Sequence, residues 1–324
     1  MDFPPLPSIK WFAPCALALA IGSAHAYPDK PIRLIIGFPP GGGADAVARP
    51  VADEMAKHLG QPVIVENRPG AGTTIAAAAG ATAAPDGYTL YMGSANLYGA
   101  MGVVYKDFKY DGDDYTPISL LTVSPLLLAV SNELGVKTVQ ELVALAKSKP
   151  GALNYASSGI GGAPHLAGLA FSNATNVQTV HIPYKGGAQA LQGIVGGETQ
   201  FTFATPPSVL PLAQAGRLRV IAASTEKRSP LFPDLPSVAE SGVPGYDSTF
   251  WFGLFGPKGL PKPIVDKVHD AAKRALENPE IREKLAATGN AASPSASPEE
   301  FADFARRDGE RSLKLTIDAG VTAN

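Results

Sequence analysis

Short apolar runs alternate with amphipathic segments along most of the chain. Residues 32–37, 62–66 and 88–93 are apolar runs of strand length, and residues 44–59 and 73–83 between them carry apolar side chains at helical spacing. Strands that alternate with helices are typical of parallel sheets covered by helices on both faces. This part of the chain is therefore predicted to form a βαβαβ unit.

A second α/β series follows the first. Its expected strands are residues 126–130, 154–156, 180–183, 201–204 and 217–223. Its expected helices cover residues 139–149 and begin at 164, 186 and 206, and further helices are expected at 263–277, 279–287 and from 298 onward. Two series predict two lobes, each a mostly parallel sheet flanked by helices. The apolar segments 124–130 and 217–224 are candidate crossovers between them.

These crossovers make the first lobe discontinuous in sequence. It is predicted to comprise residues 27–124 and 226–324, and the second lobe residues 125–225. The residues before the first lobe have the layout of a secretory signal peptide: Lys10, a short apolar core, and Ala24-His25-Ala26 at the cleavage site. The core is too short to span a bilayer. We therefore expect residues 1–26 to be a signal peptide and the mature chain to act in the periplasm.

Composition narrows the classes of protein that remain. Cys15 is the one cysteine among 324 residues and lies in the expected signal peptide, which excludes disulfide scaffolds, thiolate metal sites and cysteine nucleophiles from the mature chain. The formal net charge is −2 with scattered lysines and arginines, so a nucleic-acid partner is not expected. The histidines are too dispersed to propose a metal site, and no cofactor is expected.

A glycine-rich loop, residues 39–45, joins the first strand to the first helix. Its three glycines, Gly41, Gly42 and Gly43, let the backbone approach a ligand closely. The N–H groups in the first turn of the following helix have no intrahelical partner, so they point at whatever lies there. The loop therefore predicts a site for a carboxylate or phosphate. A plain tight turn is the alternative interpretation.

Ligands of open parallel sheets bind beyond the carboxyl ends of the strands. The segments that follow the expected strands are 39–45, 94–96, 157–159, 184–187 and 205–207. They contain small hydroxyls, glycines and backbone donors, which suit holding a carboxylate more than reacting with it. Helix capping is the alternative role for Ser157 and Ser158, as is capping or packing for His165. Lys185 has the alternative of a solvated loop charge.

Two other classes of protein are alternatives to a binding protein. A serine hydrolase built on Ser157 and Ser158 is one, although the chain has no G-x-S-x-G motif. A dinucleotide fold is the other, because Gly41-x-Gly43-x-x-Ala46 imitates the Rossmann fingerprint and Glu66 ends the next strand. Pro39-Pro40 lengthens and stiffens that turn, which argues against the dinucleotide.

Several segments spread in order over the mature chain form a recognisable set. They are YPDKPI at 27–32, PPGGGAD at 39–45, VENRPGAG at 65–72, PDGYTL at 85–90, LNYAS at 153–157, HLAG at 165–168, PYKG at 183–186 and WFGL at 251–254. This set resembles the Bug-type receptors, the periplasmic solute-binding proteins of tripartite tricarboxylate transporters. The resemblance implies a two-lobed α/β fold of the periplasmic binding protein type (type II-like), with a small carboxylate clasped in the cleft between the lobes.

The resemblance also implies partners and site residues. It implies a monomeric receptor without covalent chemistry that delivers its ligand to membrane transporter subunits, or to a sensor protein. Backbone groups of the first glycine loop would hold one carboxylate, and the loops at Ser94, Ser157 and Tyr184 would complete the cleft. The expected ligand-binding residues are Phe38, Gly41, Gly42, Gly43, Ala44, Asp45, Ser94, Asn96, Ser157, Ser158, Gly159, His165, Tyr184, Lys185, Gly186, Ala204 and Thr205.

One departure from the family bears on the ligand. Where many members carry an aspartate in a Phe-Asp-x-x-Pro segment, this chain has Ala204, followed by Thr205. An aspartate there is expected in receptors that bind an amino group, so its absence argues against an amino acid ligand. A dicarboxylate, a tricarboxylate and an aromatic carboxylate all remain open.

Overall fold

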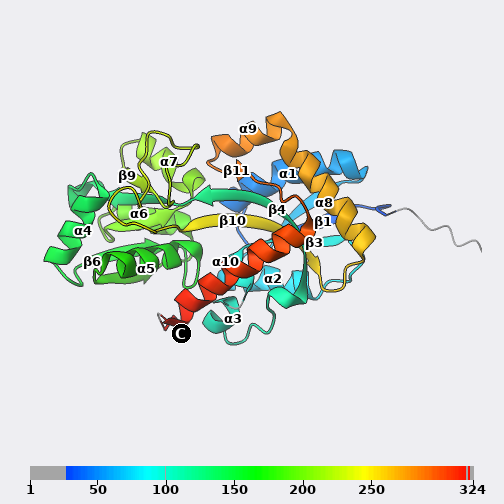
Figure 1. Cartoon of the computed structure of the whole chain (residues 1–324), viewed down its shortest axis with the longest axis horizontal. Coiled ribbons are helices and arrows are strands. Elements are labelled where there is room, and N and C mark those ends of the chain that lie inside the picture. Colours follow the sequence, from blue (N-terminus) through cyan, green and yellow to red (C-terminus); the bar gives the residue numbers. More distant parts are fainter. Residues whose placement is uncertain (1–26, 99, 319, 322–324) are drawn as a thin grey trace, which may run out of the picture.

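Two β-sheets, each with helices on both faces, lie next to one another along the long axis of the molecule (Figure 1). This computed structural model describes residues 27–98, 100–318 and 320–321. The expected signal peptide, residues 1–26, lies outside the described residues. The predicted two-lobed α/β fold is confirmed.

The first sheet has six strands in the order β11-β4-β10-β3-β1-β2. Its strands are β1 (Ile32–Ile36), β2 (Val63–Asn67), β3 (Thr89–Gly93), β4 (Tyr115–Pro125), β10 (Thr249–Pro257) and β11 (Ala291–Ala292). Its helices are α1 (Gly43–Leu59), α2 (Thr74–Ala81), α3 (Ala100–Val104), α8 (Lys262–Glu277), α9 (Pro279–Ala287) and α10 (Pro298–Asp318), with short 3-10 turns η1 (Ala71–Thr73), η2 (Ala95–Leu97) and η3 (Gly112–Asp114). One apolar core lies under α1, α8 and α9, and another under α2, α3 and α10.

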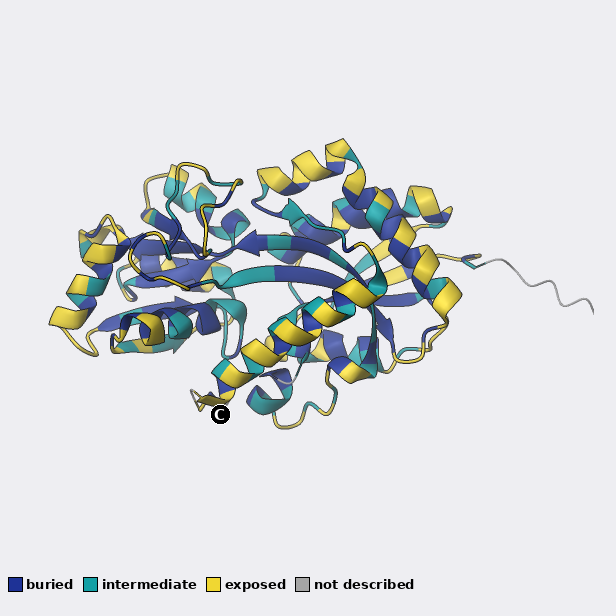
Figure 2. Cartoon of the chain, viewed as in Figure 1, coloured by how far each residue is buried: buried dark blue, intermediate teal, exposed yellow. Residues whose placement is uncertain are grey.

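The second sheet has five strands in the order β7-β6-β8-β5-β9. Its strands are β5 (Leu127–Ser131), β6 (Leu153–Ser157), β7 (Thr179–Pro183), β8 (Phe201–Ala204) and β9 (Leu218–Ala223). Its helices are α4 (Val139–Ser148), α5 (Ala163–Thr175), α6 (Gly187–Val195) and α7 (Pro206–Gln214), with the turn η4 (Asn132–Leu134). Helices α4 and α5 cover one core and α6 and α7 the other, so the strands are buried between exposed helix surfaces (Figure 2).

Both sheets are mixed, which corrects the expectation of mostly parallel sheets. The parallel pairs are β1 with β2 and β3, and β6 with β7 and β8. Strands β4 and β10 were not expected as strands, and they pair antiparallel over nine positions. The reason is topological: the chain enters the second lobe along β4 and returns along β10, so the two must run in opposite directions. Strand β5 is likewise antiparallel to β8 and β9.

Ser224 ties the segments that pass between the lobes. Its hydroxyl accepts a hydrogen bond from Leu126 N (2.8 Å) and donates one to Ser248 O (2.7 Å). Val238 and Tyr246, which the predicted lobe boundaries place in the first lobe, belong to an apolar core of the second. We therefore propose that the second lobe extends beyond the predicted boundary at residue 225, as far as Tyr246.

Local sequence explains where the helices that matter here begin and end. Val47, Val51 and Met55 repeat at helical spacing on α1 and are buried against the sheet, and Gly60 ends the helix in the left-handed conformation at φ 72°. Thr138 caps α4 by accepting from Glu141 N at 3.1 Å. Within the described part of the chain, no helix combines the length and apolar character that a membrane span needs.

Candidate functional site

Four helices that follow strands begin at residues whose side chains do not cap them. The N-cap residues of α1, α5, α6 and α7 are Gly42, Gly162, Gly186 and Thr205. By contrast, α9 begins at Asn278, whose side chain accepts from Glu280 N. Uncapped first turns keep their N–H groups available to a ligand. The starts of α1, α5 and α6 therefore offer backbone donors, whereas α7 begins with two prolines that have no N–H, and Ser208 N donates to Thr205 O at 3.0 Å.

These helix starts converge from both lobes. A methyl group placed on Gly43 of α1 would lie 3.5 Å from Thr205 Oγ1, so the first lobe's glycine loop meets the start of α7. One placed on Gly187 would lie 4.0 Å from Ser208 Oγ, which brings α6 beside α7. The sequence-predicted loops after β1, β7 and β8 thus come together at the boundary between the lobes.

Asp45 holds the first glycine loop in place. Its carboxylate accepts hydrogen bonds from Gly41 N (3.0 Å), from Arg49 Nε and Nη2 (2.8 and 2.9 Å) and from Asn67 Nδ2 (3.1 Å). The Arg49 guanidinium is the main reason why the pKa of Asp45 falls to about 2. Asn67 Nδ2 also donates to Phe38 O at 2.9 Å. The carboxylate is therefore fully engaged with its own lobe, where it fixes the glycine loop.

The second lobe's glycine loop, residues 157–162, is held by uncharged groups. Ser157 is fully buried, and its hydroxyl lies 2.6 Å from His181 Nε2, 3.0 Å from Gly159 O and 3.2 Å from Gly159 N. His165 Nδ1 accepts from Gly161 N at 3.0 Å. Burial lowers the pKa of His165 to about 4, and burial together with the neighbouring His165 lowers that of His181 to about 3. Both rings are therefore neutral at physiological pH.

Tyr184, Lys185 and Ala204, which were also predicted as ligand-binding residues, lie in three different surroundings. Tyr184 N donates to Ser157 O at 3.0 Å, so its loop adjoins the second glycine loop. Its phenol points elsewhere, because a methyl group on Gly193 in α6 would lie 2.3 Å from the Tyr184 hydroxyl. Lys185 is exposed, and Ala204 is buried in the core under α6 and α7. The Tyr184 N–H is thus engaged within the second lobe, and contact between Tyr184 and a ligand stays a prediction.

Ser94, Asn96 and Phe38 also engage their own lobe. Ser94 Oγ donates to Asn96 Oδ1 at 2.9 Å, which folds the turn after β3 on itself. The Phe38 ring packs edge-on against Phe252 with centroids 6.1 Å apart, as part of the first lobe's core. Direct contact between any of these residues and a ligand remains a prediction.

His181, Arg49 and Asn67, which hold the two glycine loops, were not predicted from the sequence. His181 was considered only as a metal ligand, and nothing in its spacing indicated that it would bond to Ser157. Arg49 lies four residues after Asp45, which is the spacing of an ion pair on one helix face, and this signal was available in the sequence. Within the described residues, no cluster of three or more histidine, cysteine, aspartate or glutamate side chains could hold a metal ion.

The geometry argues against both alternatives to a binding protein. The Ser157 hydroxyl has one hydrogen, and donating it to Gly159 O leaves His181 Nε2 as the donor to Ser157, which is the reverse of a catalytic base. Ser157 is also fully buried. In the dinucleotide interpretation Glu66 would bind a ribose, but it pairs with Arg33 (3.6 Å) and Arg68 (2.7 Å).

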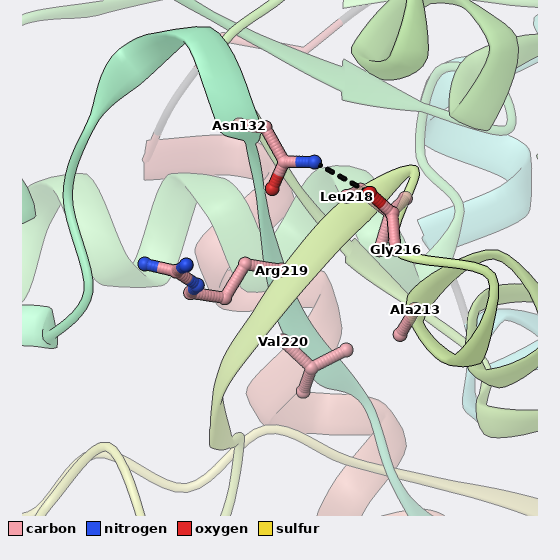
Figure 3. Close-up of a pocket in the computed structure, with 6 residues that line it drawn as sticks. All are labelled: Asn132, Ala213, Gly216, Leu218, Arg219 and Val220. Atoms are coloured by element: carbon pink, nitrogen blue, oxygen red, sulfur yellow. Dashed lines mark hydrogen bonds between the residues drawn. The ribbon is translucent and has the colours of Figure 1, made fainter.

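A hollow of about 520 Å³ lies elsewhere, beside the edge strand β9 (Figure 3). Asn132 and Gly216 close one side of it through a hydrogen bond of 2.8 Å. Its wall includes Leu218, which pairs with Ser131 at the opposite end of the sheet from the carboxyl end of β8. Since ligands of such sheets bind beyond the carboxyl ends, this hollow is not the candidate site.

Two lobes joined by crossing strands, with uncapped helix starts meeting between them, define a two-lobed solute-binding protein. The family model for the tripartite tricarboxylate transporter family receptor matches residues 47–319. The chain belongs to this family, as its resemblance to Bug-type receptors predicted.

Individual relatives agree with this assignment. Protein BugT of Bordetella pertussis is 34% identical over 301 residues, which is 92% of each chain. The solved structure of R. palustris Rpa4515 with adipate is 32% identical, with a TM-score of 0.85, over 92% of this chain and 100% of that one. MatC from Rhodopseudomonas palustris with bound malate is also 32% identical, with a TM-score of 0.80, over 90% and 100%.

Proposed function

We propose that this chain is a periplasmic receptor that binds a small carboxylate between its lobes and delivers it to a tripartite tricarboxylate transporter. The observation that carries the proposal is the meeting of the uncapped start of α1 in the first lobe, at Gly43, with the Thr205 hydroxyl of the second lobe. Backbone N–H groups and helix dipoles at such ends stabilise anions. Family membership supports the proposal, as do the adipate and malate bound to two similar proteins.

The charges around the glycine loops bear on the class of ligand. Asp45 is paired with Arg49, and both His165 and His181 are neutral. None of these groups is an unpaired carboxylate that would attract an amino group, and Ala204 stands where amino-group binders of the family carry an aspartate. The ligand is a dicarboxylate, a tricarboxylate or an aromatic carboxylate in preference to an amino acid.

Binding works by closure of the lobes without covalent chemistry. The carboxylate oxygens receive N–H groups from both lobes, so the ligand binds the closed arrangement more tightly and shifts the population toward it. The closed receptor, acting as a monomer, then presents its ligand to the transporter's membrane subunits. Presentation to a sensor protein is the second candidate role.

A thermal-shift panel tests the proposal. A ligand at a hundred times its dissociation constant adds about 2.7 kcal/mol to the free energy of unfolding, which raises Tm by several degrees. We expect such a shift from adipate, malate or another member of a panel of di-, tri- and aromatic carboxylates, with aspartate, glutamate and NAD as controls. A shift for NAD alone, or for the amino acids alone, would contradict the proposal.

Localisation is tested separately. The intact mass of the protein recovered from the periplasm is expected to be that of a chain beginning at Tyr27. The hydrogen bonds from Tyr27 Oη to Gly87 O (2.8 Å) and from Lys267 Nζ to Tyr27 O (2.6 Å) fix this residue to the first lobe, so the folded unit extends to Tyr27. Recovery of the unprocessed chain in the cytoplasm would contradict it.

A further inference from the structure

Four aromatic rings stack in a column inside the second lobe. They belong to Phe201 on β8, Tyr155 on β6, His181 on β7 and His165 on α5, with successive centroids 5.5, 4.9 and 3.7 Å apart. The two imidazoles lie nearly parallel, at 8°. The column therefore runs from the lobe's apolar core to the second glycine loop, residues 157–162.

The two imidazoles at the end of the column hold that loop through three residues. His165 bonds the Gly161 N–H, and His181 bonds the Ser157 hydroxyl. This hydroxyl in turn contacts both the N–H and the carbonyl of Gly159. Gly159 and Gly161 have φ angles of 138° and 74°, in the region that favours glycine, so the loop needs such external partners to keep one shape.

The same loop touches the first lobe. A methyl group on Gly161 would lie 2.7 Å from Val104 Cγ2, and Val104 is the last residue of α3. The loop is thus close-packed against the opposite lobe where the two meet. A change in its shape would alter both the N–H groups at the start of α5 and the fit of the lobes.

We propose that His165 and His181 are positioning residues that set the second glycine loop in its ligand-binding shape through the Gly161 N–H and the Ser157 hydroxyl. The inference rests on the proposed function and adds residues to it. The two histidines do this without touching the ligand, and the ring column beneath them fixes their orientation.

The hydrogen bond from the Gly161 N–H requires an uncharged His165. A protonated His165 carries a hydrogen on Nδ1 and could no longer accept from the Gly161 N–H. The two histidines face one another, and the other titratable group in the column is Tyr155, whose pKa burial raises. Among the described residues, neither histidine forms an ion pair with a carboxylate that would favour its charged form.

Paired substitutions separate the hydrogen bonds from the stacking. His165→Phe and His181→Phe keep an aromatic ring in the column and remove the bonds to the loop. His165→Asn and His181→Gln keep a polar group in reach of the loop and remove the ring. Ser157→Ala removes the hydroxyl link with the smallest change of volume. His269→Phe is the matched control, because His269 is also buried and bonds Ser295 O at 3.2 Å, in the first lobe.

Hydrogen–deuterium exchange of residues 157–162 without ligand is the first readout. We expect at least tenfold faster exchange in His165→Phe, His181→Phe and Ser157→Ala, and unchanged exchange in the His269→Phe control. Unchanged exchange in the Phe variants and in Ser157→Ala would overturn the proposal. Ser157→Ala decides the question if the Phe variants fail to fold.

Affinity for adipate and malate, measured by calorimetry, is the second readout. We expect at least tenfold weaker binding in the two Phe variants of the loop histidines, a smaller loss in His165→Asn and His181→Gln, and no loss in His269→Phe. Weaker binding with an unchanged exchange rate would overturn the proposal, because the rings would then act by contacting the ligand. If the wild type binds no carboxylate, the proposed function fails, and the exchange experiment still decides the role of the histidines.

Discussion

The two glycine loops of this protein are held by opposite kinds of chemistry. In the first lobe, the charged pair Asp45 and Arg49 fixes the loop, and the Arg49 side chain is 49% exposed. In the second lobe, the neutral rings of His165 and His181 do so from within the lobe. Both arrangements leave backbone N–H groups at the helix starts for a ligand, so the same role can be filled by a charged pair and by uncharged rings.

The charged and uncharged contacts predict that salt affects the first glycine loop and that acid affects the second. An ion pair whose arginine is half exposed is weakened by salt and is indifferent to pH above the pKa of its carboxyl. Neutral histidines are indifferent to salt, because little charge is there to screen, and they are sensitive to acid. The loops are therefore expected to loosen under different conditions, which the following experiments test.

The largest expected effect is that of mild acid on the second lobe. Histidine in the unfolded chain titrates near 6.5, whereas the folded pKa is about 4 for His165 and about 3 for His181. The unfolded state thus binds more protons between these values, so stability is full above about pH 6.5 and falls as pH drops toward 4. From pH 7 to 5 we expect a loss of about 2 kcal/mol for each ring, measured by urea unfolding.

A double variant, His165→Asn with His181→Gln, provides the control for this experiment. Its free energy of unfolding is expected to be lower at pH 7 and nearly flat between pH 7 and 5. A wild type whose stability does not change over that range would show that the two histidines are not neutral in the folded protein. Asp45 does not interfere, because its contribution is lost only below about pH 4, toward its folded pKa of about 2.

The second effect comes from removing the carboxylate of the first loop. Asp45→Ala leaves Gly41 N and Asn67 without their acceptor and Arg49 without its partner, so we expect the free energy of unfolding to fall by about 2 kcal/mol and carboxylate binding to weaken. Denaturant unfolding and calorimetry check both. Asp53→Ala, an exposed residue of the same helix, is the matched control. If the two substitutions had equal effects, the Asp45 carboxylate would not be what holds the first glycine loop.

The smallest effect is expected from salt and from Arg49. Arg49→Lys loses the two-pronged contact with Asp45 but keeps the charge, so its Tm should fall by less than that of Asp45→Ala. Raising sodium chloride to about 0.5 M should reduce the difference between Arg49→Lys and wild type, because the Debye length then becomes shorter than about 8 Å. A difference that grew with salt would mean that Arg49 acts by packing.

Much of the fold could be predicted from the sequence, and the position of the site stays a prediction. The alternation of strands and helices and the loops after β1, β6, β7 and β8 were predicted correctly, because they follow from local periodicity and glycine placement. The long strands β4 and β10 were missed, since their apolar and polar residues gave no clear strand boundary. Their antiparallel pairing depends on how the chain passes between the lobes, which no local pattern encodes.

For individual residues of the candidate site, too, local features could be predicted from the sequence and long-range contacts could not. The sequence by itself predicted a backbone cradle at Gly41 to Gly43 and a helix from residue 44, one residue from the observed start at Gly43, because glycine freedom and helix-end chemistry are local. Only the tertiary structure decided that His181, on β7, bonds Ser157, on β6, and that Gly43 meets Thr205 across the lobes. Contacts between residues far apart in sequence depend on strand order, register and lobe packing, and these are properties of the whole folded chain.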